Sequence, residues 1–125
     1  MLQTPVDLSK VTTILYPGQE RGGNFKPHGG FRFDHSKSEE IIVKTALDGY
    51  ITDASRYIEM GEVQYMFDFQ NDCGIRYRFD HLLVLSPKLM KIAENLPQAK
   101  KDDSRTTHIN KNIKVTQGEV IATAI

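Results

Sequence analysis

The amino-acid sequence predicts a mostly β domain, arranged as a β-sandwich with one short helix. Aromatic residues occupy alternate positions in 65–69 and again in 75–81, and the polar residues 71–74 between them form a turn signal. This pattern is typical of a β-hairpin with one buried face. Apolar residues at helical spacing behind Pro87 predict a helix over about 87–96.

The remaining strands follow from short apolar or alternating runs that glycine, proline and polar residues separate. From 30 to 34 the alternation places Phe31 and Phe33 on one face, and Arg32 and Asp34 on the other. Strands are expected over 11–15, 30–34, 41–46, 50–58 and 113–124, the last interrupted at Gln117-Gly118, with a turn at Asp48-Gly49 and an exposed loop over 98–112.

Length and charge limit the classes of protein that the chain can represent. With 125 residues it has the length of one domain, 1–125. Its 16 basic and 16 acidic residues balance, so no overall field favours nucleic acid or an anionic membrane. No stretch approaches the roughly 18 apolar residues of a membrane span. Cys73 is the only cysteine, which excludes an internal disulfide, and residues 1–10 show no secretory signal.

Two segments resemble each other along the chain. Residues 43–51 (VKTALDGYI) and 115–121 (VTQGEVI) both have the pattern of a strand, a turn containing glycine and a second strand. Neither unit can bury its apolar face alone. The two are therefore expected to pack as paired sheets of a sandwich.

Four segments also match, in order and spacing, the motifs of a known family. Residues 28–31 (HGGF) resemble the start of an H-x-G-x-D motif, and 43–51 resemble a V-x-A-x-x-D-G-x-V hairpin. Residues 79–82 (FDHL) are similar to an aromatic-x-H-L segment, and 115–121 to a closing V-x-x-G-x-x-I strand. Together they resemble the LytM/lysostaphin-type zinc endopeptidases, which implies a β-sandwich of the duplicated-hybrid-motif type.

The resemblance implies hydrolysis of peptide bonds, usually in peptidoglycan, by a zinc-bound water that three protein ligands support. It makes His28 the first ligand and His81 the histidine that assists the water. Alignment without a gap from His28 puts Arg32, which cannot bind zinc, at the second ligand; alignment back from Asp48-Gly49 puts Asp34 there, in the same strand parity as His28. The H-x-H motif of the third ligand has no counterpart up to Ile125.

Each candidate also has a structural interpretation. His28 fits a hydrogen-bonded loop histidine, Asp34 fits an exposed turn acid, and His81 fits a histidine packed among the aromatic residues of its strand, since it shares a face with Tyr77 and Phe79. The basic residues Arg76 and Arg78, similar in type to Arg56 but not placed beside it by the sequence, fit either an anion site or a solvated outer face of the sheet.

The sequence therefore predicts a catalytically degenerate endopeptidase-like domain that binds a cell-wall peptide or a protein ligand, with zinc at an incomplete ligand set. The resemblance implies the cell envelope or the extracellular space. An active zinc endopeptidase completed by residues beyond Ile125 is the alternative. A lipoyl-, biotinyl- or phosphocarrier-like domain is disfavoured because Asp48-Gly49 carries no lysine at its tip. Residues 86–112 form an insertion relative to the family, beside the expected cleft.

Overall fold

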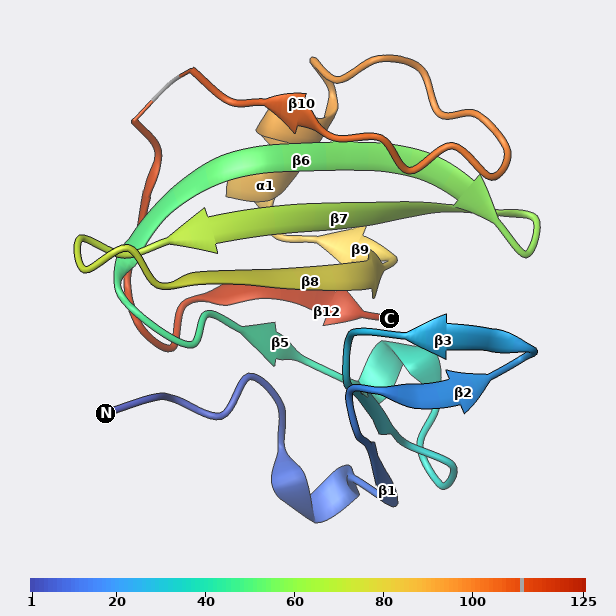
Figure 1. The fold of residues 1–125 in the computed structure, drawn as a ribbon. Helices are drawn as coiled ribbons and strands as arrows, with labels where there is room; N and C mark the ends of the chain where they lie inside the picture. Colours follow the sequence, from blue (N-terminus) through green and yellow to red (C-terminus); the bar gives the residue numbers. More distant parts are fainter. Residues whose placement is uncertain (111) are drawn as a thin grey trace.

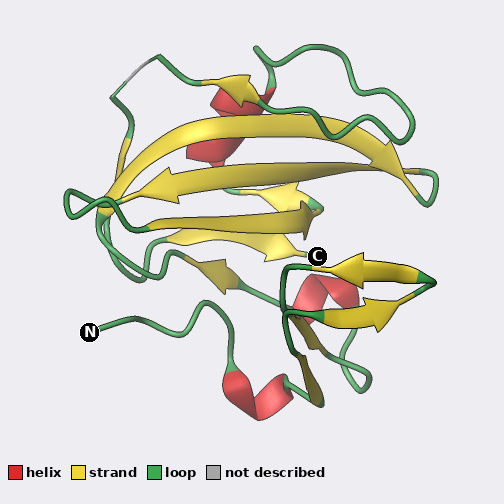
Figure 2. Ribbon diagram, viewed as in Figure 1, coloured by secondary structure: helices red, strands yellow, loops and turns green. Residues whose placement is uncertain are grey.

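The computed structural model describes residues 1–110 and 112–125 and confirms a mostly β sandwich with one short α-helix (Figures 1 and 2). The larger sheet has the order β10–β6–β7–β8, with β11 also paired to β6. Its strands are β6 (Gly49–Glu59), β7 (Glu62–Gln70), β8 (Arg76–Leu82), β10 (Thr107–His108) and β11 (Lys114–Val115). The smaller sheet has the order β5–β12–β9, formed by β5 (Val43–Lys44), β9 (Val84–Leu85) and β12 (Val120–Ala124). All named strand pairs are antiparallel.

Each of the two similar segments crosses from one sheet to the other, in opposite directions. The chain passes from β5 in the smaller sheet to β6 in the larger one, and from β11 in the larger sheet to β12 in the smaller one. The first strand of each segment forms hydrogen bonds with the last strand of the other segment: β5 pairs with β12, and β11 pairs with β6. A carboxylate oxygen of Asp48 accepts a hydrogen bond from the Gln117 backbone N–H at 2.6 Å, and the Gly118 N–H donates to the Thr45 carbonyl at 3.0 Å. The two turns therefore hold each other in place.

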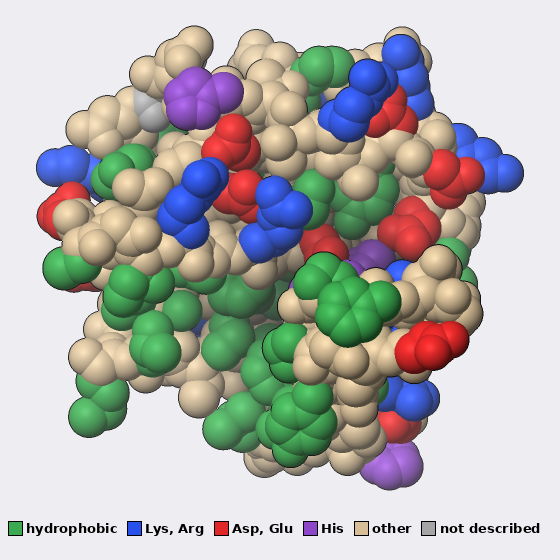
Figure 3. Space-filling model, viewed as in Figure 1, with side chains coloured by type: hydrophobic (Ala, Val, Ile, Leu, Met, Phe, Trp, Pro, Cys, Tyr) green, Lys and Arg blue, Asp and Glu red, His purple; other side chains and the backbone are tan. Residues whose placement is uncertain are grey.

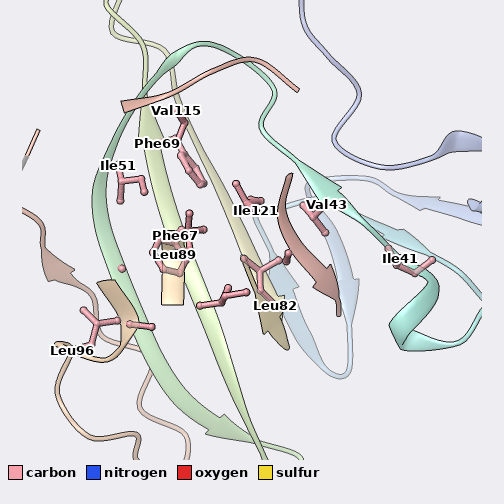
Figure 4. Close-up of a cluster of buried hydrophobic side chains, with 14 of the residues drawn as sticks. Ile41, Val43, Ile51, Phe67, Phe69, Leu82, Leu89, Leu96, Val115 and Ile121 are labelled. Carbon is pink, nitrogen blue, oxygen red and sulfur yellow. The ribbon is translucent and has the colours of Figure 1, made fainter. Parts of the chain in front are cut away.

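The core lies between the two sheets and the helix (Figure 4). Phe67 and Phe69 on β7 are completely buried, and Phe69 stacks on Tyr77 of β8 with ring centroids 5.0 Å apart. The predicted alternation of this hairpin is thus confirmed for its aromatic residues. The core is completed by smaller apolar side chains from both sheets and the helix, among them Val43, Ile51, Leu82, Leu89, Val115 and Ile121.

The alternation fails at the end of β8. The register with β7 shifts between the pairs Tyr65–Leu82 and Phe67–Phe79, so two residues, Asp80 and His81, occupy the space of one. Because of this β-bulge Leu82 takes the inward position and is 1% exposed, whereas the side chain of His81 is 55% exposed. The expectation that His81 shares the buried face of Tyr77 and Phe79 was therefore wrong.

The helix α1 (Pro87–Ala93) begins as predicted and ends earlier than residue 96. Ser86 caps its N-terminus by accepting a hydrogen bond from the Leu89 N–H, and Leu89 and Ala93 face the core. After Ala93 the hydrogen bonds change to the 3-10 pattern, since the Leu96 N–H donates to the carbonyl of Ala93, three residues back. Pro97 follows directly. No helix among residues 1–110 and 112–125 is long and apolar enough to cross a membrane.

The segment expected as an exposed loop over 98–112 is in part a sheet edge. Residue 101 bridges Ile58, and β10 pairs with β6. Residue 111 of the expected loop lies outside the described residues. The polar segment thus forms backbone hydrogen bonds with the edge of β6. Side-chain polarity does not reveal this pairing, because it depends on the backbone.

The N-terminal part forms two small ladders below the sandwich in Figure 1. The strand β1 (Thr13–Leu15) pairs with β4 (Gly30–Arg32), and β2 (Gln19–Arg21) forms a hairpin with β3 (Asn24–Lys26). Two 3-10 helices, η1 (Leu8–Lys10) and η2 (Ser38–Glu40), flank these ladders. A bend at His28 separates β3 from β4, so the alternation of β4 does not extend back to it. The expected shared parity of His28 and Asp34 was therefore wrong.

Candidate functional site

His28 is held by its backbone rather than by its ring. Arg21 Nη2 donates to the His28 carbonyl oxygen at 2.9 Å. The next residue packs tightly against β1, because a Cβ on Gly29 would lie 2.9 Å from the Leu15 carbonyl oxygen. Glycine at position 29 is thus required for this close approach, and the two small ladders together fix where His28 lies.

His81 occupies a strained position in the bulge of β8. Its φ of 57° lies in the left-handed region that residues other than glycine rarely adopt. The His81 N–H donates to the Tyr57 hydroxyl at 3.2 Å, and Nδ1 lies 2.8 Å from Gln64 Oε1 and 3.4 Å from Glu59 Oε2. Contacts to β6 and β7 therefore hold both the backbone and the ring of His81, a kind of constraint often found at functional sites.

The two histidines line the same groove, which has two arms. The apolar arm has a volume of about 570 Å³, and the polar arm about 340 Å³. Both arms are lined by His28, Asp80 and His81, which therefore mark their junction. The other walls of the apolar arm are mainly apolar, including Ile14, Tyr16, Phe31, Phe33 and Leu82. Figure 3 shows apolar side chains gathered over the N-terminal ladders and acidic side chains next to them.

The polar arm is acidic. Glu59, Asp80 and Asp102 line it with one basic side chain, Lys26. Burial raises the pKa of the Tyr57 phenol in its wall to about 12, so that hydroxyl keeps its proton at neutral pH and can donate it to an acceptor. The groove thus offers an apolar surface, two imidazoles and an acidic end.

Asp34 is engaged elsewhere. Its carboxylate accepts hydrogen bonds from the Thr12 hydroxyl and from Arg32 Nη2, each at 2.7 Å. The hydrogen bond from Thr12 and the neighbouring guanidinium of Arg32 hold the pKa of the Asp34 carboxyl below its usual value. Phe33 lines the apolar arm of the groove, whereas Asp34, on the other face of the chain, belongs to neither arm.

These positions test the zinc site that the resemblance implies. His28 and His81 face one groove, but the carboxylate expected beside His28 forms an ion pair with Arg32. Within residues 1–110 and 112–125, no three histidine, cysteine or acidic side chains are grouped so that they could hold a metal ion. The second zinc ligand that the resemblance implies is therefore not available beside His28.

Several residues around His81 have no signal in the sequence. Tyr57, Glu59 and Gln64 come from strands whose alternation predicts core or solvent, and only the bulge of β8 brings His81 beside them. Two of the arginines considered for an anion site are paired instead. Arg76 bonds to Asp53 at 3.2 Å, and Arg78 binds Asp68 through two hydrogen bonds of 2.5 and 2.8 Å on the outer face of the sheet.

Comparison of the chain with protein-family models, with curated proteins and with solved structures finds no match. The likeness to LytM/lysostaphin-type endopeptidases therefore rests on the four sequence segments. What the groove can do must be derived from its own residues.

Proposed function

We propose that this chain is a non-catalytic, endopeptidase-like domain that binds an extended peptide in the groove between His28 and His81. The observation that carries the proposal is that both histidines line both arms of the groove while Asp34 is paired with Arg32. A peptide can bind there through its own side chains and backbone. Peptide-bond hydrolysis by a zinc-bound water would need three protein ligands around one ion, and the carboxylate that the resemblance offers beside His28 is paired with Arg32 instead.

The edge of the larger sheet supports a peptide rather than a compact small molecule. The strand β8 ends the sheet order and pairs with β7. Consecutive residues of β8, from Arg78 to Leu82, line the apolar arm. Arg78 and Phe79, which precede the bulge, point to opposite faces of the sheet, so a hollow that both residues line reaches the unpaired edge of β8. An extended peptide can add to such an edge through main-chain hydrogen bonds and place alternate side chains in pockets.

The two arms suggest what the peptide carries. An apolar arm of about 570 Å³ has the size of ordinary ligand pockets, and the acidic arm favours a cationic group. The ligand is therefore a peptide segment with an apolar part next to an amine. The resemblance places it in the cell wall or on a protein partner at the cell envelope.

The proposal is tested by titrating the purified protein with cell-wall stem peptides and with extended peptides of apolar and lysine residues, followed by calorimetry. Phe31, 37% exposed, lines the apolar arm, so Phe31→Ser is expected to weaken binding about tenfold by removing one apolar anchor. Ile75→Ser, at an exposed apolar residue of the β7–β8 turn, is the matched control and should bind normally. Equal peptide affinities of Phe31→Ser and Ile75→Ser would show that the peptide does not bind in the groove.

Metal analysis separates the proposed module from a zinc endopeptidase. Protein dialysed against zinc is expected to hold less than one equivalent, and His28→Ala should not change that content. Stoichiometric zinc that is lost in His28→Ala would overturn the non-catalytic assignment in favour of the enzyme. Peptide binding with no bound zinc supports the module.

A further inference from the structure

A second pocket lies on the opposite edge of the larger sheet, outside the groove. The edge of β6 that faces away from β7 is covered at Ile58 by the bridge to Lys101 and at Ala54 by the pair with Thr107. Between these points the chain leaves the edge, and a pocket of about 320 Å³ opens. It is lined by Ser55, Arg56, Pro97, Gln98, Lys100 and residues 103 and 105–107.

The backbone of Arg56 faces this pocket. The Ile58 N–H and carbonyl bond to the chain at Lys100 and Asp102, and the Thr52 carbonyl accepts from the Ile109 N–H. Residues 52 and 58 therefore direct their backbone groups outward from the sheet. Because backbone direction alternates along a strand, Arg56, between them, also directs its N–H and carbonyl outward, at the point where the covering chain is missing.

Ser55 supplies a second group without a partner. It is 2% exposed, and its Oγ is the one buried side-chain oxygen or nitrogen of the described residues that has no hydrogen bond. Such an orphan hydroxyl carries an unrepaid desolvation cost unless a ligand satisfies it. Its place in the wall of the pocket points to a ligand that accepts a hydrogen bond.

The charge of the pocket is positive. Arg105 is neutralised by Asp103, with bonds of 2.8 and 2.7 Å. Arg56 donates to the carbonyl oxygens of Leu96 and Pro97, which fix its guanidinium without neutralising it. Among the ion pairs of the described residues, neither Arg56 nor Lys100 has a carboxylate partner. Two positive charges therefore remain in a pocket that also offers the Arg56 N–H and the Ser55 hydroxyl as hydrogen-bond donors.

We propose that this pocket binds a phosphoryl group, as free phosphate or as a phosphate monoester, between Arg56, Lys100 and the hydroxyl of Ser55. A dianion matches the two uncompensated cations, and its several oxygens can accept from the guanidinium, the ammonium, the Ser55 hydroxyl and the Arg56 N–H together. The volume exceeds that of a bare phosphate ion and leaves room for the substituent of a monoester. The site is independent of the peptide groove.

The test is a titration of 15N-labelled protein with inorganic phosphate and, separately, with phosphoserine, at constant ionic strength. Saturable shifts are expected at Ser55, Arg56 and Lys100, and tighter binding of phosphoserine than of phosphate identifies the monoester as the natural source. Lys100→Gln should weaken binding about tenfold, the equivalent of one charge-assisted hydrogen bond. Lys91→Gln removes a charge from α1 at a residue that does not line the pocket, and should leave binding unchanged.

Ser55→Ala distinguishes a ligand group from a structural one. It removes an unpartnered hydroxyl, so the free protein should unfold at the same or a higher temperature while its phosphate affinity falls severalfold. Three results would overturn the proposal: shifts spread over all basic residues, acetate binding as tightly as phosphate, or Lys100→Gln and Lys91→Gln behaving alike.

Discussion

His81 Nδ1 lies 2.8 Å from the side-chain oxygen of Gln64, and this contact defines the chemistry of the imidazole. The amide of Gln64 is oriented because its Nε2 donates to the Glu59 carbonyl at 3.3 Å. Its Oε1, which can only accept, therefore faces the ring. A neutral His81 must carry its proton on Nδ1, which leaves Nε2 as an acceptor for a donor group of a ligand.

The tautomer of His81 is expected to depend on Gln64. In Gln64→Leu the nearer acceptor at Nδ1 is lost and only Glu59 Oε2, 3.4 Å away, remains, so the neutral ring should move toward the Nε2-protonated form. Imidazole 15N chemical shifts above the titration range of histidine measure the two forms. His28 provides an internal control, because its side chain has no contact to Gln64. An unchanged Nδ1-protonated ring in the variant would mean that Gln64 does not set the tautomer.

The backbone of His81 stores strain that glycine should relieve. A residue with a Cβ at φ 57° costs about 1 kcal/mol relative to glycine. His81→Gly and His81→Ala both lose the ring, so the difference between them reports the backbone alone. We expect His81→Gly to be more stable than His81→Ala by about 1 kcal/mol in urea unfolding. Equal stabilities would show that the bulge relaxes when the ring is removed.

Gly49 is required by the approach of two chain segments. A Cβ at this position would lie 2.3 Å from the Gln70 carbonyl oxygen, which belongs to the backbone and cannot move aside cheaply. Gly49→Ala is therefore expected to destabilise the domain by about 2–4 kcal/mol, in the range of severe single substitutions. Gly30→Ala is the matched control, since its Cβ would lie 3.7 Å from Leu15 Cδ1, an ordinary contact. Thermal unfolding of both variants measures the difference, and similar melting temperatures would contradict it.

Most of the sandwich follows from sequence patterns. Alternating aromatic residues predict the β7–β8 hairpin, the Asp48-Gly49 signal predicts the entry to β6, and Pro87 marks the start of α1. These elements obey local rules, since side-chain period and turn chemistry are properties of neighbouring residues. The pairing of residues 100–109 with β6 depends on an unfilled sheet edge far away in sequence. Local patterns carry no information about it.

The candidate site is only partly predictable for a similar reason. His28 and His81 are recognisable from motif spacing, and they do face one groove. The bulge at His81 depends on the register between two strands, and the bend at His28 depends on the contact of Gly29 with β1. Both shift a side chain from the face that alternation assigns to it. The partners of His81, Tyr57 and Gln64, therefore emerge only from the three-dimensional arrangement.

The positive charge around the pocket beside Arg56 can be measured without any ligand, through the pKa of Asp103 in its wall. Hydrogen bonds from Arg105, with a contribution from the charge of Lys100, lower the pKa of this carboxyl from 3.8 to about 2. Because the folded pKa lies below the unfolded one, the ionised carboxylate favours folding above about pH 4, and that contribution is lost as the pH falls toward 2. In Arg105→Gln the guanidinium and its two hydrogen bonds are absent while the backbone N–H of residue 105 still donates to the carboxylate, so the pKa of Asp103 should rise part of the way toward 3.8. Carboxyl 13C titration follows it, with Asp34, whose lowered pKa comes from Thr12 and Arg32, as the internal control. If the pKa of Asp103 stays near 2 in the variant, a group other than Arg105 holds the carboxylate.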